Sequence, residues 1–204
     1  MIKIYHVPHS RSLRVVWLME ELGEPYELVK LDFPPRDDYL SVNPQGTVPA
    51  IEDDGIRMIE SIAILQYITG RRLPEAMSIT VGPKPDPAAY ADHLQFLHYG
   101  EASLTAPLSV IFRTGLIAPE GQKTNPTTED QTATFTKRLG LLDQRLSDGR
   151  EWLMADKFTI ADISVGYALG LAQFMKLGGA FPKTVADYAA RLQARPAFQR
   201  ATAK

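Results

Sequence analysis

A proline-rich stretch at residues 79–87, with the sequence ITVGPKPDP, constrains the fold of this chain more than any other feature. Its three prolines and one glycine are unfavourable to both helices and strands, and this composition is typical of a linker. Strand and helix patterns alternate before it, whereas no strand pattern recurs after it. We therefore predict a first domain at residues 1–78, a linker at 79–87 and a second domain at 88–204.

The N-terminal residues predict a strand, a helix and a second strand. Ile2, Ile4 and His6 share one face of a run with period two, as in a strand. A helix should follow, because an apolar stripe recurs at helical spacing and then meets a glycine (Val15, Leu18, Met19, Leu22 and Gly23). The segment YELVKL at 26–31 predicts the second strand. Short links between these elements favour a right-handed parallel β-α-β unit.

The remainder of the first domain predicts a hairpin and a helix. Apolar segments at 48–52 and 56–59 flank Asp53-Asp54-Gly55, and an Asp-Gly pair is typical of a tight hairpin turn. The segment SIAILQYIT at 61–69 is evenly apolar and closes at Gly70, so we expect a helix packed on more than one side. The first domain should therefore be an α/β fold with the order β-α-β then β-β-α.

The second half predicts an all-helical domain, with helices at about 88–115, 127–147, 160–176 and 183–194. Its clearest boundary is at Thr159, where a threonine cap and Asp162 three residues later form the pattern of a capping box. We expect this motif to serve folding rather than chemistry.

Composition excludes several classes of function. The net charge of −2 favours neither nucleic acid nor an anionic membrane surface as a partner. We expect a cytoplasmic protein, because no transmembrane run or signal peptide is visible. The chain has no cysteine, so it can form no disulfide and supplies no thiol nucleophile. Its four histidines lack the spacing of a metal-binding helix, and we therefore expect no metal.

Three short motifs carry residues suited to chemistry. Ser10 and Ser12 lie between the first strand and the first helix, where either can cap the helix or donate to an anion near its positive end. Arg11 adds a cation there or is merely solvated, and Arg14 can pair with an acidic neighbour. Pro49, where the third strand should start, removes a ladder donor, and if its peptide bond is cis the backbone of Val48 forms an exposed edge that an extended peptide could pair with. The alternative is a corner between loop and strand that binds no ligand.

The third motif is Glu60-Ser61, which follows the fourth strand. Ser61 is expected to be the N-cap of the next helix, whose first amides could hold a carboxylate while Glu60 holds an ammonium group. An amino-acid head group carries both charges. Glu60 can equally be an acid that stabilises the helix dipole.

Together these motifs resemble the cytosolic glutathione transferases, in a serine-dependent bacterial form. The resemblance rests on SRSLR at 10–14, NPQGTVPAIEDDG at 43–55, ESIAILQYI at 60–68 and FTIADI at 158–163, and it covers nearly the whole chain. It implies a thioredoxin-like domain, with glutathione as co-substrate and no metal, followed by an all-helical domain that lines the electrophile pocket.

The resemblance also implies roles for single residues. Ser10, with Ser12 as the alternative, would donate a hydrogen bond to the glutathione sulfur. The backbone of Val48, before a cis Pro49, would pair with the cysteinyl part, and Glu60 and Ser61 would hold the γ-glutamyl end. Thr47 stands where the family often has a lysine or glutamine. It would therefore contact the glycyl carboxylate only through its short hydroxyl side chain, or not at all. The second substrate would lie against Tyr99, Phe112 and Arg113, which otherwise serve ordinary helix packing.

The expected function is that of a detoxifying glutathione S-transferase, which ionises the glutathione thiol for attack on a small electrophile. Glutathione-dependent disulfide reduction, peroxide reduction or isomerisation would use the same thiolate. An alternative of another class is a non-catalytic module that binds apolar ligands or proteins. A plain thioredoxin-like redox protein is disfavoured because the chain has no CxxC pair. We also expect a homodimer, by resemblance and because 62–68 is densely apolar.

Overall fold

The computed structural model describes residues 1–35, 37–72, 87–155 and 157–204. The chain forms two compact units, one of Met1–Val81 with Gln193–Lys204 and one of Gly82–Leu192. The expected linker lies outside the described residues, apart from Pro87, which is the first residue of a helix. The last twelve residues, which we expected to continue the helical domain, group with the first unit instead.

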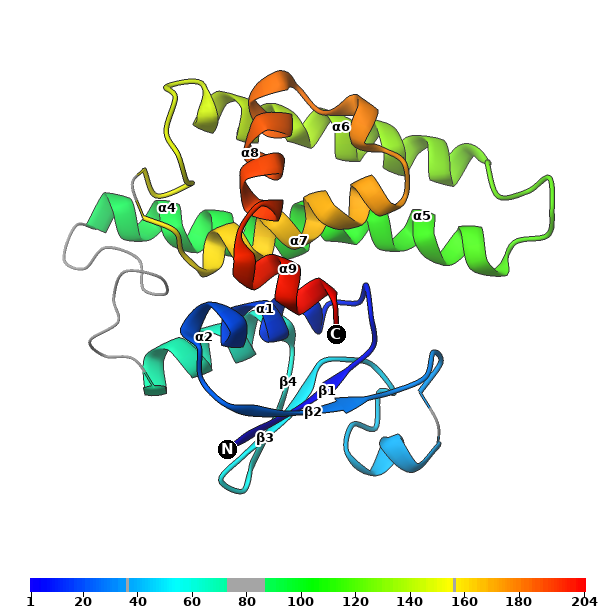
Figure 1. Cartoon of the computed structure of the whole chain (residues 1–204). Coiled ribbons are helices and arrows are strands. Elements are labelled where there is room, and N and C mark those ends of the chain that lie inside the picture. The colour runs from blue at the N-terminus through cyan, green and yellow to red at the C-terminus, as the bar shows by residue number, and fades with distance from the viewer. Residues whose placement is uncertain (36, 73–86, 156) are drawn as a thin grey trace. The chain divides into compact units, whose positions relative to one another are not determined.

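The first unit contains a four-stranded mixed sheet with the strand order β2-β1-β3-β4 (Figure 1). Strand β1 (Ile2–His6) is parallel to β2 (Tyr26–Lys30), and helix α1 (Leu13–Leu22) connects them, which confirms the predicted β-α-β unit. Strand β3 (Ala50–Asp53) is antiparallel to both β1 and β4 (Ile56–Ile59). A short 3-10 helix, η1 (Asp37–Ser41), precedes β3.

The hairpin between β3 and β4 turns at the predicted residues. Asp54 and Gly55 both have positive φ, 49° and 82°, as a two-residue turn with a right-handed twist requires. Strand β3 begins at Ala50, two residues later than the pattern predicted. The delay follows from Pro49, which has no N–H to give to a sheet ladder.

Helices α1 and α2 (Ser61–Arg72) pack against each other in the first unit. The αL residue Gly23 ends α1, as predicted, and its amide bonds to the Met19 carbonyl. Gly70 does not end α2, which runs on to Arg72. Four apolar side chains of α2 are already buried in the single chain, so they offer no exposed face for the expected dimer (Ile62, Ile64, Leu65 and Ile68).

A C-terminal helix that the pattern did not predict, α9 (Pro196–Thr202), completes the first unit by packing on α1. The rings of Trp17 and Phe198 meet edge to face, with centroids 4.8 Å apart. Beside them, the Arg195 guanidinium group donates two hydrogen bonds to the Glu21 carboxylate, at 2.6 and 2.8 Å.

The second unit is helical, as predicted. The expected helix at 88–115 consists of α4 (Pro87–His98), a π-helical segment η2 (Tyr99–Thr105) and α5 (Ala106–Ile117). The second unit continues with α6 (Pro126–Leu146), α7 (Ile160–Phe174), a short 3-10 turn η3 (Gly178–Ala180) and α8 (Lys183–Gln193). None of the helices in the described ranges combines the length and apolar character needed to cross a membrane.

Helix α7 is the centre of this unit, with twelve buried residues. The predicted capping box at its start is present: the Asp162 carboxylate accepts from the Thr159 amide at 2.8 Å, and the Thr159 hydroxyl accepts from the Ala161 amide at 3.2 Å. Asp162 also accepts from the Tyr188 hydroxyl and the Leu153 amide. The motif therefore joins the helix start to α8 and to the preceding loop, which is a structural role.

Candidate functional site

The sheet topology brings the three sequence motifs to one end of the sheet. Strand β3 is antiparallel to β1, and Tyr5, next to the end of β1, pairs with Ala50, the first residue of β3. Strand β4 ends at Ile59, which also pairs with Ala50. The loops after β1, before β3 and after β4 therefore leave the sheet at the same end. They contain residues 7–12, 47–49 and 60–61.

The serines of the first loop differ in exposure and in partners. Ser12 is fully buried, whereas Ser10 is half-buried. The Ser12 hydroxyl lies 2.8 Å from His6 Nδ1 and 2.7 Å from the Ser10 hydroxyl. The Ser10 hydroxyl lies 2.7 Å from the Val7 carbonyl oxygen. Of the two hydroxyls, that of Ser10 is therefore the one a ligand can approach.

The start of α1 differs from expectation. Ser12 occupies the N-cap position, but its side chain makes no capping hydrogen bond. The first amides of the helix are already bonded to backbone carbonyls of the preceding turns: Leu13 N to Ser10 O at 3.0 Å, and Arg14 N to Arg11 O at 3.2 Å. An anion at this helix start would therefore meet the Ser10 hydroxyl and the helix dipole rather than unbonded amides.

The second loop places a cis peptide at the start of β3. The Val48–Pro49 bond is cis, as the resemblance implied, and Val48 is half-buried. The loop is held from within, because the Thr47 carbonyl accepts from the Tyr39 hydroxyl and from Asn43 Nδ2, both at 2.7 Å. The exposed Thr47 hydroxyl also accepts from Asn43, at 3.2 Å. A second cis bond, Phe33–Pro34, was not predicted.

In the third loop Glu60 adopts a left-handed backbone with φ of 72°, which a residue with a Cβ rarely adopts. Glu60, rather than Ser61 as predicted, takes the N-cap place, because its carbonyl accepts the first helical bond, from Ile64 at 2.9 Å. The amides of residues 61–63 therefore have no partner within the helix. An exposed carboxylate and a helix start stand side by side here.

Arg14 links the first and third loops, a role the sequence did not reveal. It is fully buried, and its Nη1 donates to the Ser61 hydroxyl at 3.1 Å. Arg14 thereby ties the start of α1 to the start of α2. One signal for this role is visible in the sequence: a charged residue lies on the apolar side of the helix that follows SRS.

His6 is the second residue of the site that we did not predict. The sequence placed it on the first strand but did not show that it contacts Ser12. It ends the buried face of β1 and is 2% exposed. Burial lowers its pKa to about 4, with smaller contributions from the charges of Lys30 and His9. The ring is therefore neutral at pH 7. Its period-two alignment with Ile2 and Ile4 was the available signal.

The three residues expected to line the electrophile pocket all lie in the second unit. Tyr99 borders a cavity of about 450 Å³ with four residues of α6 (Thr134, Lys137, Arg138 and Leu141), and its hydroxyl donates to the Arg138 carbonyl. Phe112 and Arg113 lie on α5 with their side chains exposed.

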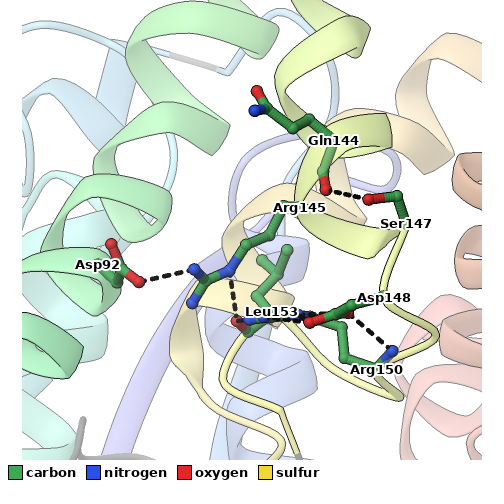
Figure 2. Close-up of polar contacts among 7 residues, drawn as sticks. All are labelled: Asp92, Gln144, Arg145, Ser147, Asp148, Arg150 and Leu153. Carbon is green, nitrogen blue, oxygen red and sulfur yellow. Dashed lines mark hydrogen bonds and ion pairs between the residues drawn. The ribbon is translucent and has the colours of Figure 1, made fainter.

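A separate charged cavity of about 310 Å³ lies between α4, α6 and the loop after α6 (Figure 2). Arg145 contacts the Asp92 carboxylate at 2.6 Å and donates to the Leu153 carbonyl at 3.0 Å. Arg150 contacts Asp148 at 2.6 Å and holds the pKa of that carboxyl down at about 2. Because these charges satisfy one another, the cluster is suited to fixing the loop. Within the described residues, no group of three histidine or acidic side chains could hold a metal ion.

This arrangement defines a class of protein: a thioredoxin-like unit with a cis proline before its third strand, in a chain whose other unit is helical. Comparison with known families agrees. The glutathione S-transferase N-terminal domain matches residues 1–70, and the glutathione S-transferase C-terminal domain matches residues 125–200. The chain belongs to the glutathione S-transferase family.

Individual relatives span the whole chain. The glutathione S-transferase GstA of Escherichia coli O157:H7 is 30% identical over 204 residues, covering 97% of this chain and 96% of the relative. A glutathione transferase family member from Pseudomonas fluorescens, solved with two glutathione bound, is 27% identical, with a TM-score of 0.82 over 98% of this chain and 92% of the other. A glutathione transferase from Phanerochaete chrysosporium, in complex with oxidized glutathione, is 28% identical, with a TM-score of 0.83 over 98% and 94%.

Proposed function

We propose that this protein is a glutathione transferase in which Ser10 holds the glutathione thiol as a thiolate for attack on a small electrophile. The observation that carries the proposal is the convergence of Ser10, the cis Val48–Pro49 bond and Glu60-Ser61 at one end of the sheet. The solved relatives that contain glutathione support the same ligand.

Each loop suits one part of glutathione. The backbone of Val48 would pair with the cysteinyl residue in the manner of an added strand. The first amides of α2 would take the carboxylate of the γ-glutamyl group, while Glu60 would take its ammonium group. Thr47 offers the glycyl carboxylate only a short hydroxyl that already accepts from Asn43. We therefore expect most of the affinity to come from the γ-glutamyl end.

The energy needed to ionise the thiol is within reach of this site. A thiol with a pKa near 8.5 must be stabilised as thiolate by about 2 to 3 kcal/mol to be mostly ionised at pH 7. One hydrogen bond to a charged group contributes about 1.5 to 3 kcal/mol. The dipole of α1 adds about 0.3 to 1 kcal/mol. Ser10 supplies the larger part, because the first amides of α1 are engaged elsewhere.

The reaction then needs no group from the protein that forms a covalent bond. The thiol proton leaves to solvent, the thiolate sulfur attacks an electrophilic carbon, and a carbon–sulfur bond replaces the bond to the leaving group. The leaving group departs with the electron pair. The protein contributes ionisation and proximity, while glutathione contributes the nucleophile. This agrees with a chain that has no cysteine.

Glutathione-dependent reduction of a disulfide or peroxide remains the second candidate, because it starts from the same thiolate. With no protein thiol to hold a mixed disulfide, a second glutathione would have to complete the reduction. Products distinguish the two reactions: conjugation consumes one glutathione and yields a thioether, whereas reduction yields oxidised glutathione.

The proposal is tested by an ultraviolet difference titration of glutathione bound to wild-type protein and to Ser10→Ala and Ser12→Ala variants. We expect wild-type protein to lower the thiol pKa by about two units and Ser10→Ala to raise it again by about one to two units. Calorimetry should show that Ser10→Ala still binds glutathione. Conjugation of an aryl halide should fall about ten- to a hundredfold.

Other outcomes have definite meanings. Glutathione that binds wild-type protein with an unshifted thiol pKa would indicate a non-catalytic module. A thiol pKa that depends on Ser12 but not on Ser10 would move the donor to the buried serine.

We also propose that the protein is a homodimer, because its sequence resembles the cytosolic glutathione transferases. A monomeric mass in light scattering at micromolar concentration would contradict this proposal.

A further inference from the structure

Four polar atoms form an unbroken line between the core of the sheet and the proposed sulfur site. His6 Nδ1 lies 2.8 Å from the Ser12 hydroxyl oxygen. That oxygen lies 2.7 Å from the Ser10 hydroxyl oxygen, which lies 2.7 Å from the Val7 carbonyl oxygen. Each separation is that of a short hydrogen bond.

Counting protons fixes the direction of this line. Each short contact needs one proton, because two lone pairs facing each other at 2.7 Å repel. The Val7 carbonyl brings no proton, and the two hydroxyls bring one each. Three contacts therefore require a third proton, and only His6 Nδ1 can supply it. The bonds then run from His6 to Ser12, from Ser12 to Ser10, and from Ser10 to Val7.

The opposite tautomer leaves one contact without a proton. If Nδ1 accepted a bond, the Ser12 proton would point to His6. Ser10 would then have to direct its single proton either to Ser12 or to Val7. One of its two contacts at 2.7 Å would be left with two facing lone pairs.

Amide contacts agree with the same direction. The Val7 amide donates to the Ser12 hydroxyl at 3.3 Å, and the Ser12 amide donates to the Ser10 hydroxyl at 3.3 Å. With these bonds, both lone pairs of each hydroxyl are used. The Ser12 hydroxyl also lies 3.3 Å from the Val7 carbonyl oxygen, but its contact with the Ser10 oxygen is shorter, at 2.7 Å, and takes the Ser12 proton. The buried ring of His6 is neutral, since its pKa is about 4, so it carries one ring proton.

We propose that His6 is a positioning residue for thiolate formation: its Nδ1–H orients the Ser12 hydroxyl, which in turn leaves the single proton of Ser10 available to the glutathione sulfur. The inference rests on the proposed function of Ser10. When a thiolate binds, the Ser10 hydroxyl turns away from the Val7 carbonyl and donates its proton to the sulfur, because the two oxygens cannot stay 2.7 Å apart without a proton between them. The donations into Ser10 from Ser12 persist, and a hydroxyl that accepts hydrogen bonds is a stronger donor.

The first test concerns the histidine itself and needs no glutathione. Nitrogen-15 NMR of the wild-type protein at pH 7 should show His6 Nδ1 as the protonated ring nitrogen and Nε2 as the unprotonated one. An unprotonated Nδ1 would overturn the proposal. The result is independent of whether the protein is a transferase, so the two proposals can fail separately.

The second test compares two substitutions that differ in where they place an amide. In His6→Asn the side-chain amide can occupy the place of Nδ1, whereas in His6→Gln it reaches toward the place of Nε2. We expect His6→Gln to raise the thiol pKa of bound glutathione by about half a unit and His6→Asn to restore much of the difference. His93→Gln, at a buried histidine of the second unit, is the control.

The measurement is the ultraviolet thiolate titration, together with calorimetry for glutathione affinity. A merely structural role for His6 would change folding and affinity but leave the thiol pKa of the bound fraction where wild-type protein sets it. The proposal is overturned if both His6 variants give the wild-type thiol pKa. If wild-type protein lowers that pKa and Ser10→Ala reverses it, the proposed function stands whatever the His6 variants show.

Discussion

Glu60 shows at the level of one residue how this site carries strain. Its φ of 72° lies in the left-handed region, which costs a residue with a Cβ about 1 to 2 kcal/mol. The conformation places an exposed carboxylate at the start of α2. Glycine would fit the backbone better, so the presence of glutamate there favours a role in binding over a role in folding.

Glu60→Gly and Glu60→Ala separate these roles. Both variants lose the carboxylate, so both should bind glutathione at least about tenfold more weakly, as measured by calorimetry. Only glycine relieves the backbone, so Glu60→Gly should be about 1 kcal/mol more stable than Glu60→Ala in urea unfolding. Unchanged affinity in both variants would remove Glu60 from the binding site.

At the level of elements, the π-helical segment η2 packs closely on α7. A Cβ built on Gly100 would lie 2.4 Å from the Ser164 hydroxyl and 2.5 Å from its carbonyl carbon, and that backbone cannot turn away. The Ser164 hydroxyl also donates to the Leu97 carbonyl at 2.7 Å. The contact requires a glycine for space rather than for its backbone angles.

Gly100→Ala should therefore destabilise the protein by about 1 to 3 kcal/mol, measured by urea unfolding, because the two helices must move apart. Gly140→Ala is a matched control: this residue lies inside α6, and a Cβ there would meet nothing within 4 Å. Gly140→Ala should raise the free energy of unfolding by up to about 1 kcal/mol, because alanine has a better helix propensity than glycine. Equal effects at both positions would contradict the packing argument.

The packing of α9 on α1 makes a second prediction at this scale. Phe198→Ala should cost about 2 kcal/mol, because the half-buried ring covers Trp17. In a Trp152→Phe background, Trp17 is the only tryptophan, and its emission should shift to the red. Arg200→Ala removes the exposed partner of Glu20, but that carboxylate keeps its hydrogen bond from the Tyr26 hydroxyl and its contact with Lys204. The variant should therefore cost about 1 kcal/mol and leave the emission unchanged.

For the whole molecule, two buried histidines couple stability to pH. Burial lowers the pKa of His6 and of His93 to about 4, from 6.5. The unfolded chain therefore binds more protons than the folded chain between about pH 4 and pH 6.5. The free energy of unfolding rises with pH across that window and levels off above it.

Lowering the pH from 7 to 5 should cost about 2 kcal/mol for each histidine, measured by urea unfolding at both values. His93→Gln should remove about half of this loss, because the histidine that titrates in the second unit is gone. A pH dependence that His93→Gln leaves intact would show that other groups control stability there.

Local patterns sufficed for most of the secondary structure. Period-two and helical spacing predicted the four strands, α1 and the main helices of the second unit, and Asp54-Gly55 predicted the hairpin turn. Local patterns failed where tertiary packing determines whether a helix forms or where it ends. Gly70 did not end α2, and α9 is a short helix whose stability comes from its contact with α1.

The sequence by itself determined the order of elements, the cap at Thr159 and the presence of Ser10, Pro49 and Glu60 in separate loops, because turns, caps and periodicity are local properties. Only the tertiary structure decided that these loops meet, that Arg14 joins α1 to Ser61, and that His6 reaches Ser12. Strand pairing places residues far apart in sequence at one end of a sheet, and the register that does so is set by the burial of whole faces.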